Sequence, residues 1–211
     1  MLRVLSMVCG ILLCSAAYAQ DTATITDGDT VGQDGIIYRL HGIDAPEFAQ
    51  TCDGVPCGKV ATETMAQLAE GRRLDCEARG EDGYGRTIAV CKNGDIDIGA
   101  EMVRLGYAWA YVRFSDDYVA LEISARDQRT GMWNNNPEPP WVFRERRWDS
   151  ASTEAPDGCP IKGNISQNGR IYHPPWSPWY SRTRINTSKG ERWFCDEGEA
   201  VAAGWRAPRW R

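Results

Sequence analysis

The sequence predicts an α+β fold: a small, partly open β-barrel of five short strands with helices between them, followed by a small disulfide-stapled module. Short β-like segments separated by turn residues recur through the first half of the 211-residue chain. Segments with helical spacing of apolar residues lie between and after them. Residues 159–211 contain two cysteines and five tryptophans, a density that favours a small ordered unit.

The predicted strands are short and rich in β-branched and aromatic residues. The first is broken by an Asp-Gly turn, and Asp34-Gly35 leads into the second. The third and fourth are joined by the turn-rich segment Gly80–Gly85 and form a hairpin. In order, the strands are Thr24–Thr26 with Thr30–Val31, Ile36–Leu40, Arg73–Glu77, Thr87–Cys91 and Tyr107–Val112.

Three helices are expected among these strands. Lys59–Ala69 carries apolar residues at helical spacing and ends before Gly71. Ile96–Gly106 reads as a short helix stopped by glycine, and Tyr118–Arg129 as a helix closed by Gly131. Five short strands with interspersed helices are typical of a partly open OB-fold barrel.

The first 19 residues differ from the rest and predict a signal peptide. Arg3 is followed by an apolar run, and Ala17-Tyr18-Ala19 is a small-x-small cleavage pattern. The apolar run is too short to span a membrane. We expect an exported protein, periplasmic or secreted.

Cysteine usage agrees with export, because six of the eight cysteines remain after the signal peptide is removed. An oxidising compartment would pair them. Cys52 and Cys57 bracket a tight loop, Cys76 and Cys91 can face each other across the hairpin, and Cys159 and Cys195 remain in the tail. The alternatives are buried free thiols or a zinc site, for which Cys159, His173 and Cys195 supply three ligands but no fourth.

The acidic net charge argues against fast association with nucleic acid. The formal net charge is −5, and residues 20–149 contain 14 Lys and Arg against 23 Asp and Glu. Nucleic-acid-binding proteins are usually basic. Long-range attraction of DNA should therefore be weak.

Four acidic side chains nevertheless gather around one arginine. Asp27 and Asp29 end the first strand segment, Asp44 and Glu47 follow the second, and Arg39 lies between them. Clustered carboxylates repel one another unless a cation lies among them, and Ca²⁺ and Mg²⁺ prefer such oxygen ligands. A guanidinium is a bidentate phosphate binder. The pattern favours a phosphoryl-transfer site, although either acidic segment alone could be a simple turn or loop.

The short motifs of this chain resemble those of the thermonuclease family, the secreted staphylococcal-type nucleases built on a five-stranded OB-fold. The resemblance covers residues 22–133, in the family's order and at nearly its spacing. The matching strings are Asp27-Gly28-Asp29-Thr30, Arg39-Leu40, Asp44-Ala45-Pro46-Glu47, Tyr84-Gly85-Arg86 and Gly106-Tyr107-Ala108 with Tyr111.

The resemblance implies a calcium site. Asp29 and Asp44 would be the carboxylate ligands of Ca²⁺, and Ala45 would contribute its backbone carbonyl. The family has threonine at this last position, but a main-chain oxygen does not depend on the side chain. Asp27 would hold the ligands in place.

The resemblance also implies the groups that act on the substrate. Glu47 would position and deprotonate the attacking water, and Arg39 and Arg86 would grip the scissile phosphate. Tyr84 and Tyr111 would line the nucleotide pocket. The family often has lysine where this chain has glycine just before Tyr84, so looser phosphate contact is expected there.

Residues beyond the barrel are less informative. The basic and aromatic segment Trp141–Trp148 either packs back on the barrel or extends the binding surface. We expect a domain at residues 20–148, a linker at 149–158 and a Cys/Trp-rich module at 159–211, whose arginines among aromatics could contact nucleic acid or envelope glycans.

Together these features predict a secreted, Ca²⁺-dependent endonuclease that cleaves DNA and RNA and leaves 3′-phosphate ends. A single-stranded substrate is favoured, and the protein is expected to be a monomer. The alternative is a nuclease-fold envelope protein that binds nucleic acid or glycan with little or no turnover.

Overall fold

The computed structural model describes residues 21–208 of the chain. The predicted signal peptide, residues 1–19, lies outside the described residues. Within residues 21–208, no helix has the length and apolar character needed to cross a membrane.

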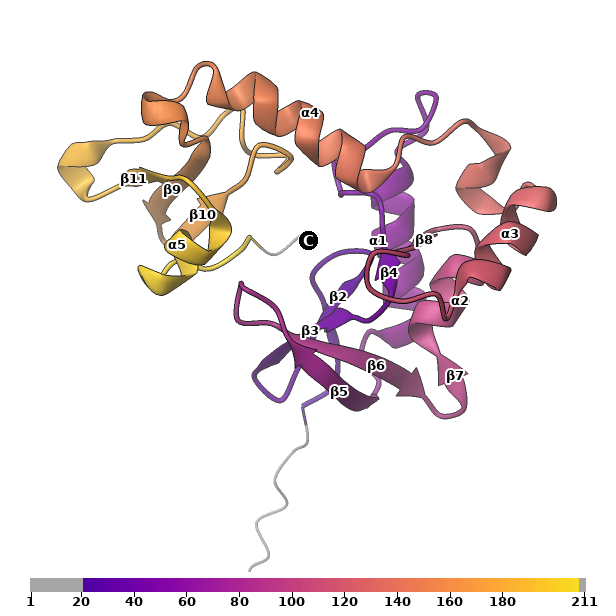
Figure 1. The fold of residues 1–211 in the computed structure, drawn as a ribbon. Helices are drawn as coiled ribbons and strands as arrows, with labels where there is room; N and C mark the ends of the chain where they lie inside the picture. Colours follow the sequence, from indigo (N-terminus) through magenta and orange to yellow (C-terminus); the bar gives the residue numbers. More distant parts are fainter. Residues whose placement is uncertain (1–20, 209–211) are drawn as a thin grey trace, which may run out of the picture.

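The barrel is built on one curved sheet (Figure 1). The strand order is β1-β2-β3-β6-β5, and β3 pairs with β6 in parallel while the other pairs along this path are antiparallel. In the described part of the chain the outer strands β1 and β5 do not pair with each other, so the sheet does not close into a ring. The strands are β1 (Thr24–Ile25), β2 (Thr30–Gln33), β3 (Ile36–Leu40), β5 (Asp75–Glu81) and β6 (Thr87–Asn93).

The predicted α+β fold with a five-stranded, partly open barrel is confirmed, but one predicted strand is not part of it. Most of Tyr107–Val112 is irregular, and only β8 (Trp109–Ala110) forms. This strand pairs with β4 (Ile43–Asp44) in a separate two-stranded sheet. A further short strand, β7 (Ile96–Asp97), pairs with β6 and occupies the start of a predicted helix.

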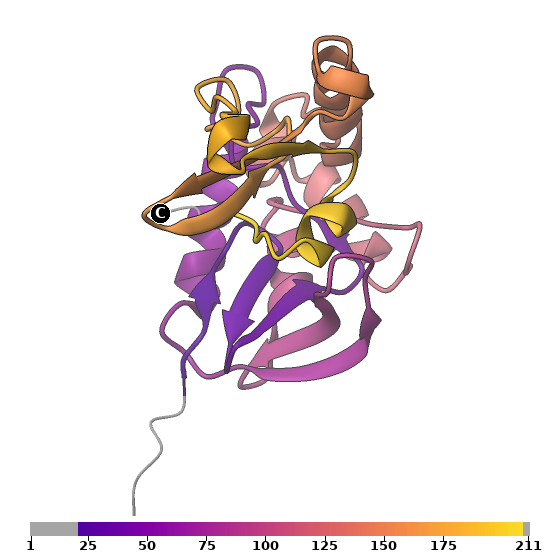
Figure 2. The same cartoon turned by 90° about the vertical axis from the view of Figure 1, so that its left-hand side faces the viewer.

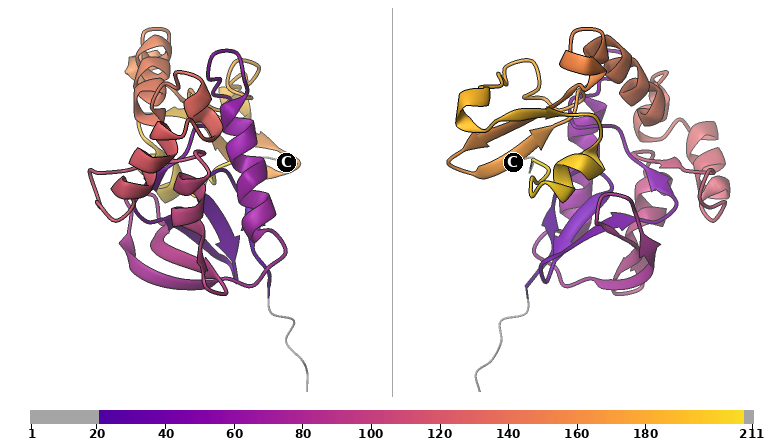
Figure 3. Two further views of the ribbon diagram at one scale, coloured as in Figure 1. Left: turned by 90° about the vertical axis from the view of Figure 1, so that its right-hand side faces the viewer. Right: turned by 60° about the vertical axis from the view of Figure 1, so that its left-hand side comes forward.

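Three helices pack against the barrel, and Figure 3 shows the first of them running beside the sheet. They are α1 (Cys57–Ala69), α2 (Ile98–Arg104) and α3 (Val119–Asp127). On α1, Ala61, Met65 and Ala69 recur at helical spacing and are fully buried in the core. Asp97 begins α2 by accepting the backbone N–H of Ala100.

Helix α4 (Pro140–Ser152) connects the barrel to the C-terminal module (Figure 1). Proline at its first position fits a helix start, where the missing N–H is not needed. The helix passes through residue 148 without a break, so the expected linker at 149–158 is partly helical. The segment Trp141–Trp148 forms the body of this helix.

The C-terminal module is a three-stranded antiparallel sheet with one helix (Figure 2). Its sheet order is β10-β9-β11, from β9 (Ile161–Ser166), β10 (Gly169–His173) and β11 (Arg192–Phe194). Helix α5 (Glu197–Ala202) packs against β11. The module has its own small core: Ile161, Tyr172, Phe194, Ala200 and Trp205.

Three disulfides join the six cysteines of the described chain, in the pairing that the sequence predicts. They are Cys52–Cys57, Cys76–Cys91 and Cys159–Cys195. The zinc alternative is wrong, because two of its three ligands are used in the last bridge. His173 instead lies 3.1 Å from Ser177 Oγ through Nδ1 and 3.0 Å from Asn164 Oδ1 through Nε2.

Candidate active site

A cavity of about 870 Å³ lies between the barrel and the C-terminal module. The barrel contributes the loops after β1, β3 and β4 and the loop between β5 and β6, and α4 contributes one side chain. Residues of β10 and α5 line the opposite wall. The predicted site residues on its surface are Asp27, Asp29, Ala45, Arg39, Glu47, Tyr84, Arg86 and Tyr111.

The pairing of β2 with β3 brings Asp29 and Arg39 together, because Thr30 lies opposite Arg39 in this ladder. Arg39 Nη1 lies 2.9 Å from Asp29 Oδ2, and Arg39 Nη2 lies 3.0 Å from Asp44 Oδ1. One guanidinium thus bridges the two predicted metal ligands. Asp44 is fully buried at the end of β4, directly behind the cavity wall.

Asp29 and Asp27 differ in their protonation behaviour. Burial alone would raise the pKa of Asp29. The charge of Arg39 and the Ala45 N–H outweigh burial, so the pKa lies below its usual value. The Ala45 N–H donates to Asp29 Oδ2 at 2.9 Å. Burial, reinforced by Asp29 and Glu47, raises the pKa of Asp27 well above its usual value. Asp27 Oδ1 accepts the backbone N–H of Asp29 at 3.2 Å, so it is placed to brace this segment.

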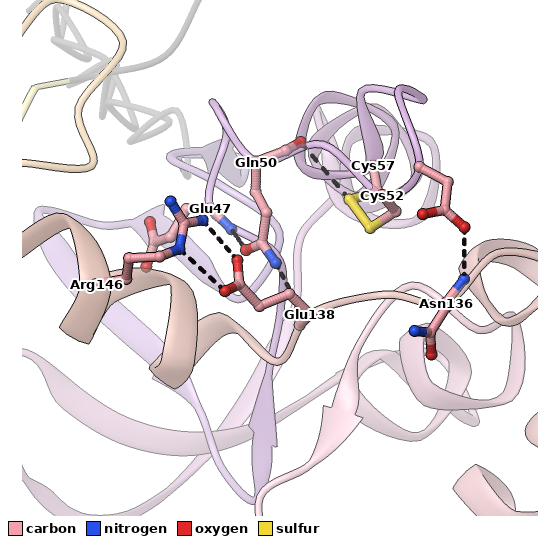
Figure 4. Close-up of a disulfide and its surroundings, with 8 residues drawn as sticks. Glu47, Gln50, Cys52, Cys57, Asn136, Glu138 and Arg146 are labelled. Carbon is pink, nitrogen blue, oxygen red and sulfur yellow. Dashed lines mark hydrogen bonds and ion pairs between the residues drawn. A yellow bond between two sulfur atoms is a disulfide. The ribbon is translucent and has the colours of Figure 1, made fainter.

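A buried glutamine fixes the main chain at Glu47. Its N–H donates to Gln50 Oε1 at 3.2 Å, and Gln50 Nε2 donates to the Glu138 carbonyl at 2.6 Å (Figure 4). Gln50 is fully buried and so ties the Glu47 loop to the segment that enters α4. Burial raises the pKa of Glu47 to about 7, although Arg144 opposes the shift.

The start of α1 packs tightly on the same loop. A Cβ atom placed on Gly58 would lie 1.7 Å from the Glu47 carbonyl oxygen. Only glycine allows the helix to approach this closely. The disulfide between Cys52 and Cys57 closes the connection between the Glu47 loop and α1 (Figure 4).

Arg86 is held in the turn between β5 and β6 by Asp82. Asp82 Oδ1 accepts the backbone N–H groups of Tyr84 and Arg86 at 2.8 and 3.0 Å, and Oδ2 accepts Arg86 Nε at 2.6 Å. This pair uses Nε, so it does not occupy the Nη groups of Arg86. Burial lowers the pKa of Arg86, but the carboxylate of Asp82 outweighs it and raises the pKa above its usual value.

The two predicted nucleotide-pocket tyrosines have different surroundings. Tyr84 is 40% exposed, and the Arg86 guanidinium lies 5.4 Å from the centre of its ring. Tyr111 stacks on Trp141 of α4, with ring centres 5.5 Å apart. One face of Tyr111 is therefore covered by this stack.

The C-terminal module supplies the opposite wall. Tyr172 Oη donates to Glu197 Oε2 at 2.9 Å, and both side chains line the cavity. Helix α5 also approaches the Arg86 turn, because a Cβ atom on Gly198 would lie 3.2 Å from the Gly83 carbonyl oxygen. The site is thus built from both parts of the chain.

Arg144 is a site residue that sequence reasoning missed. Its guanidinium contacts Asp44 through Nη2–Oδ2 at 2.7 Å and Nη1–Oδ1 at 3.1 Å, and Glu47 through Nη1–Oε1 at 2.8 Å. No motif marks it, because it lies 100 residues beyond Asp44 in a segment whose neighbours are also basic. In the sequence, the basic and aromatic composition of Trp141–Trp148 is the feature that points to a role of this segment in the site.

The carboxylate and carbonyl oxygens of the site are ligands that a hard divalent cation prefers, but their present arrangement does not form a metal site. Among residues 21–208, no group of three or more acidic, His or Cys side chains is spaced to hold a metal ion. Guanidinium groups lie between the carboxylates instead. When ionised, the four carboxylates exceed the two guanidinium groups by two charges: Asp27, Asp29, Asp44 and Glu47 against Arg39 and Arg144. Oxygen donors with this excess fit Ca²⁺ if a guanidinium moves away.

An open small barrel with carboxylates and arginines clustered in one cavity fits a phosphoester hydrolase of the OB-fold type. The chain belongs to the staphylococcal nuclease family. A family model described as Staphylococcal nuclease homologue matches residues 38–135, and a second, described as ArfC, matches residues 148–207. The resemblance seen in the motifs is therefore confirmed.

Three relatives are each similar to more than half of this chain. An "Uncharacterized endonuclease" of Escherichia coli O157:H7 is 31% identical over 144 residues, which are 64% of this chain and 90% of the relative. An "Uncharacterized endonuclease" of Haemophilus influenzae is 35% identical over 130 residues, 58% of this chain and 70% of the relative. A "Micrococcal nuclease" of Shigella flexneri is 32% identical over 147 residues, 61% and 82% of the two chains. The protein is a nuclease, and its substrate is nucleic acid.

Proposed function

We propose that this nuclease is an exported, Ca²⁺-dependent endonuclease that hydrolyses phosphodiester bonds of single-stranded DNA and RNA and leaves 3′-phosphate ends. One observation carries the proposal: Arg39, Arg86 and Glu47 face the same cavity, with Asp29 and Asp44 directly behind or beside them. Two phosphate-binding cations and one acid of raised pKa are the groups that this reaction requires.

Asp29, Asp44 and the Ala45 carbonyl would hold the Ca²⁺ ion, and Asp27 would brace Asp29 through the hydrogen bond described above. The ion would neutralise charge that builds on the phosphate oxygens. All the donors are oxygens, which agrees with calcium rather than with zinc or copper.

In the proposed reaction, Glu47 accepts a proton from a water molecule as the water oxygen attacks phosphorus. A pKa near 7 suits this role, because the group is then both partly ionised and a strong enough base. The bond from phosphorus to the 5′-oxygen breaks, and that oxygen takes a proton from solvent. The phosphate stays on the 3′-oxygen, while Arg39 and Arg86 stabilise the charge on its other oxygens.

The second wall favours a single strand. The cavity is bounded by the C-terminal module as well as by the barrel, and a single strand needs less room between two walls than a duplex does. Exposed Tyr84 offers an aromatic surface on which an unpaired base can stack. Unpaired bases present such faces, whereas bases within a duplex do not.

Three disulfides are typical of a protein that folds in an oxidising compartment. Together with the predicted signal peptide, they support a periplasmic or secreted location. We take the working form to be a monomer.

The test uses purified residues 20–211 and labelled single-stranded DNA, duplex DNA and RNA, with Ca²⁺ or with EDTA. Cleavage of single strands should require Ca²⁺, and the products should accept polymerase extension only after phosphatase treatment. Glu47→Gln and Arg86→Ala should each lower kcat by about a hundredfold or more. Glu63→Gln and Arg104→Ala are matched controls, because both side chains form exposed ion pairs away from the cavity.

Binding without cleavage under every divalent ion tested would contradict the proposal and favour a binding protein of the envelope. Cleavage that persists in EDTA would show that the reaction does not need calcium, but the protein would still be a nuclease. Products with 5′-phosphate ends would show that the other ester bond breaks.

A further inference from the structure

Arg144 occupies the oxygens that a metal ion would need. Its two Nη groups take both carboxylate oxygens of Asp44, and Nη1 also contacts Glu47 Oε1. Asp44 is fully shielded from solvent, whereas the Arg144 side chain is 24% exposed. The arginine therefore reaches a buried carboxylate from the cavity side.

The position of Arg144 is set by α4, which is fixed to both parts of the protein. Just before its start, Gln50 Nε2 donates to the Glu138 carbonyl. Further along, Arg147 Nε donates to the Pro175 carbonyl at 3.2 Å, and Trp148 packs on the core of the C-terminal module. The Arg144 guanidinium is thus positioned in the site by a helix that is anchored on both sides, and not by a loop.

We propose that Arg144 is an internal cation that competes with the divalent metal for Asp44 and Glu47, and so sets the metal affinity of the site. The inference rests on the proposed calcium dependence of the nuclease. Arg39 and Arg144 already meet at Asp44 Oδ1, so a metal ion at this carboxylate would be a third cation there, and like charges a few ångströms apart repel strongly in a partly buried site. Metal binding therefore requires the Arg144 side chain to leave Asp44.

The structure leaves room for this exchange, because Arg144 lines the cavity. The Arg144 side chain is long, and because it faces the cavity it can rotate away while α4 stays in place. In the metal-free protein Arg144 offsets the negative charge of Asp44 and Glu47. Without it, these two acids would each lose a cationic partner. The apparent metal affinity is the intrinsic affinity multiplied by the fraction of molecules in which the arginine pair is open.

The experiment measures Ca²⁺ affinity by calorimetry, and Tb³⁺ luminescence as a second readout, on the disulfide-bonded mature protein. The variants are Arg144→Gln, Arg144→Lys and the control Arg146→Gln. Arg146 lies on the same helix but pairs with Glu138 at the surface, so its loss should leave metal affinity unchanged. Arg144→Gln should bind Ca²⁺ about tenfold more tightly than the wild type, and Arg144→Lys should lie between them.

A structural readout separates competition from simple loss of charge. The Arg144 Nε–H signal in the NMR spectrum of the wild type should shift on addition of Ca²⁺, as the side chain leaves Asp44. Circular dichroism and thermal unfolding of each variant establish that it is folded, and the lysine variant keeps the charge if the glutamine variant does not fold.

Unchanged or weaker Ca²⁺ binding in Arg144→Gln, in a folded protein, would overturn the inference while leaving the calcium-dependent nuclease intact. An Arg144 signal that does not respond to Ca²⁺ would also overturn it. If neither the wild type nor any variant bound Ca²⁺ or Tb³⁺, both the inference and the proposed calcium dependence would fall.

Discussion

Asp82 holds Arg86 by one side of its guanidinium, with Oδ2 2.6 Å from Nε. The other oxygen of the same carboxylate accepts two backbone N–H groups of the turn. One acid thus shapes the turn and aims the arginine that it carries. The Nη groups, which are not used in this pair, are the ones that can meet a phosphate.

Replacing Asp82 by asparagine should therefore impair catalysis through Arg86. Asparagine keeps one oxygen for the backbone N–H groups but loses the charge that orients Nε. We expect kcat/KM on single-stranded DNA to fall about tenfold, as for a misplaced catalytic group. The double variant Asp82→Asn/Arg86→Ala should be no slower than Arg86→Ala alone, because the two residues act as one unit.

Asp95→Asn serves as the control for this prediction, since Asp95 is an exposed residue in the turn between β6 and β7. Additive losses in the double variant would mean that Asp82 acts on the reaction independently of Arg86.

Replacing Gly58 by alanine should destabilise the protein, even though alanine is the better helix former. A methyl group there would lie 1.7 Å from the Glu47 carbonyl oxygen, so α1 or the Glu47 loop must move. We expect a loss of about 3 kcal/mol in the free energy of unfolding, measured with urea, and a parallel loss of activity. A stabilised Gly58→Ala protein would show that helix propensity outweighs this contact.

Gly83→Ala is the matched substitution, because no atom lies within 4 Å of its Cβ position. Its effect on unfolding should stay within about 0.5 kcal/mol, as for other surface changes.

The C-terminal module should lose stability in mild acid through His173. Burial, with a smaller effect of Lys162, lowers the pKa of His173 to about 4, compared with 6.5 in an unfolded chain. The unfolded state binds the proton more readily, so the contribution of neutral His173 is fully present above pH 6.5 and is lost as the pH falls toward 4. The loss should approach 2–3 kcal/mol, roughly the size that such a shift implies.

Urea unfolding of the wild type and of His173→Gln between pH 7.5 and pH 4, followed by tryptophan fluorescence, measures this effect. The stability difference between the two proteins should shrink as the pH falls. Two curves that stay parallel over this range would show that His173 does not take up a proton on unfolding.

Much of the site could be predicted from sequence because its residues lie in short motifs next to turns. Asp29 lies just before β2, Arg39 is in β3 and Asp44 ends β4, so sixteen residues of consecutive short segments already bring them close together. Arg144 and Gln50 could not be found in this way. The contacts of Arg144 depend on how α4 crosses the barrel, and those of Gln50 on a partner 88 residues away.

The fold shows the same division. The hairpin, its disulfide and the core helices follow from periodicity and spacing. The aromatic residues of Tyr107–Val112 predict a barrel strand, yet only Trp109 and Ala110 pair, and they pair with β4. Trp109 packs in a cluster with Trp133 and Trp141 that is separate from the barrel core. The linker was predicted from its small polar residues, which do not prevent α4 from continuing to Ser152.

The origin of Arg144 in α4 has a consequence for biosynthesis. A chain is made from its N-terminus, so residues 21–139 emerge from the ribosome before this arginine does. Until then Arg39 would be the cationic partner of Asp44 in the nascent barrel, and a buried carboxylate with fewer charged partners is less stable. The first domain therefore reaches its final stability only when the helix that follows it has been synthesised.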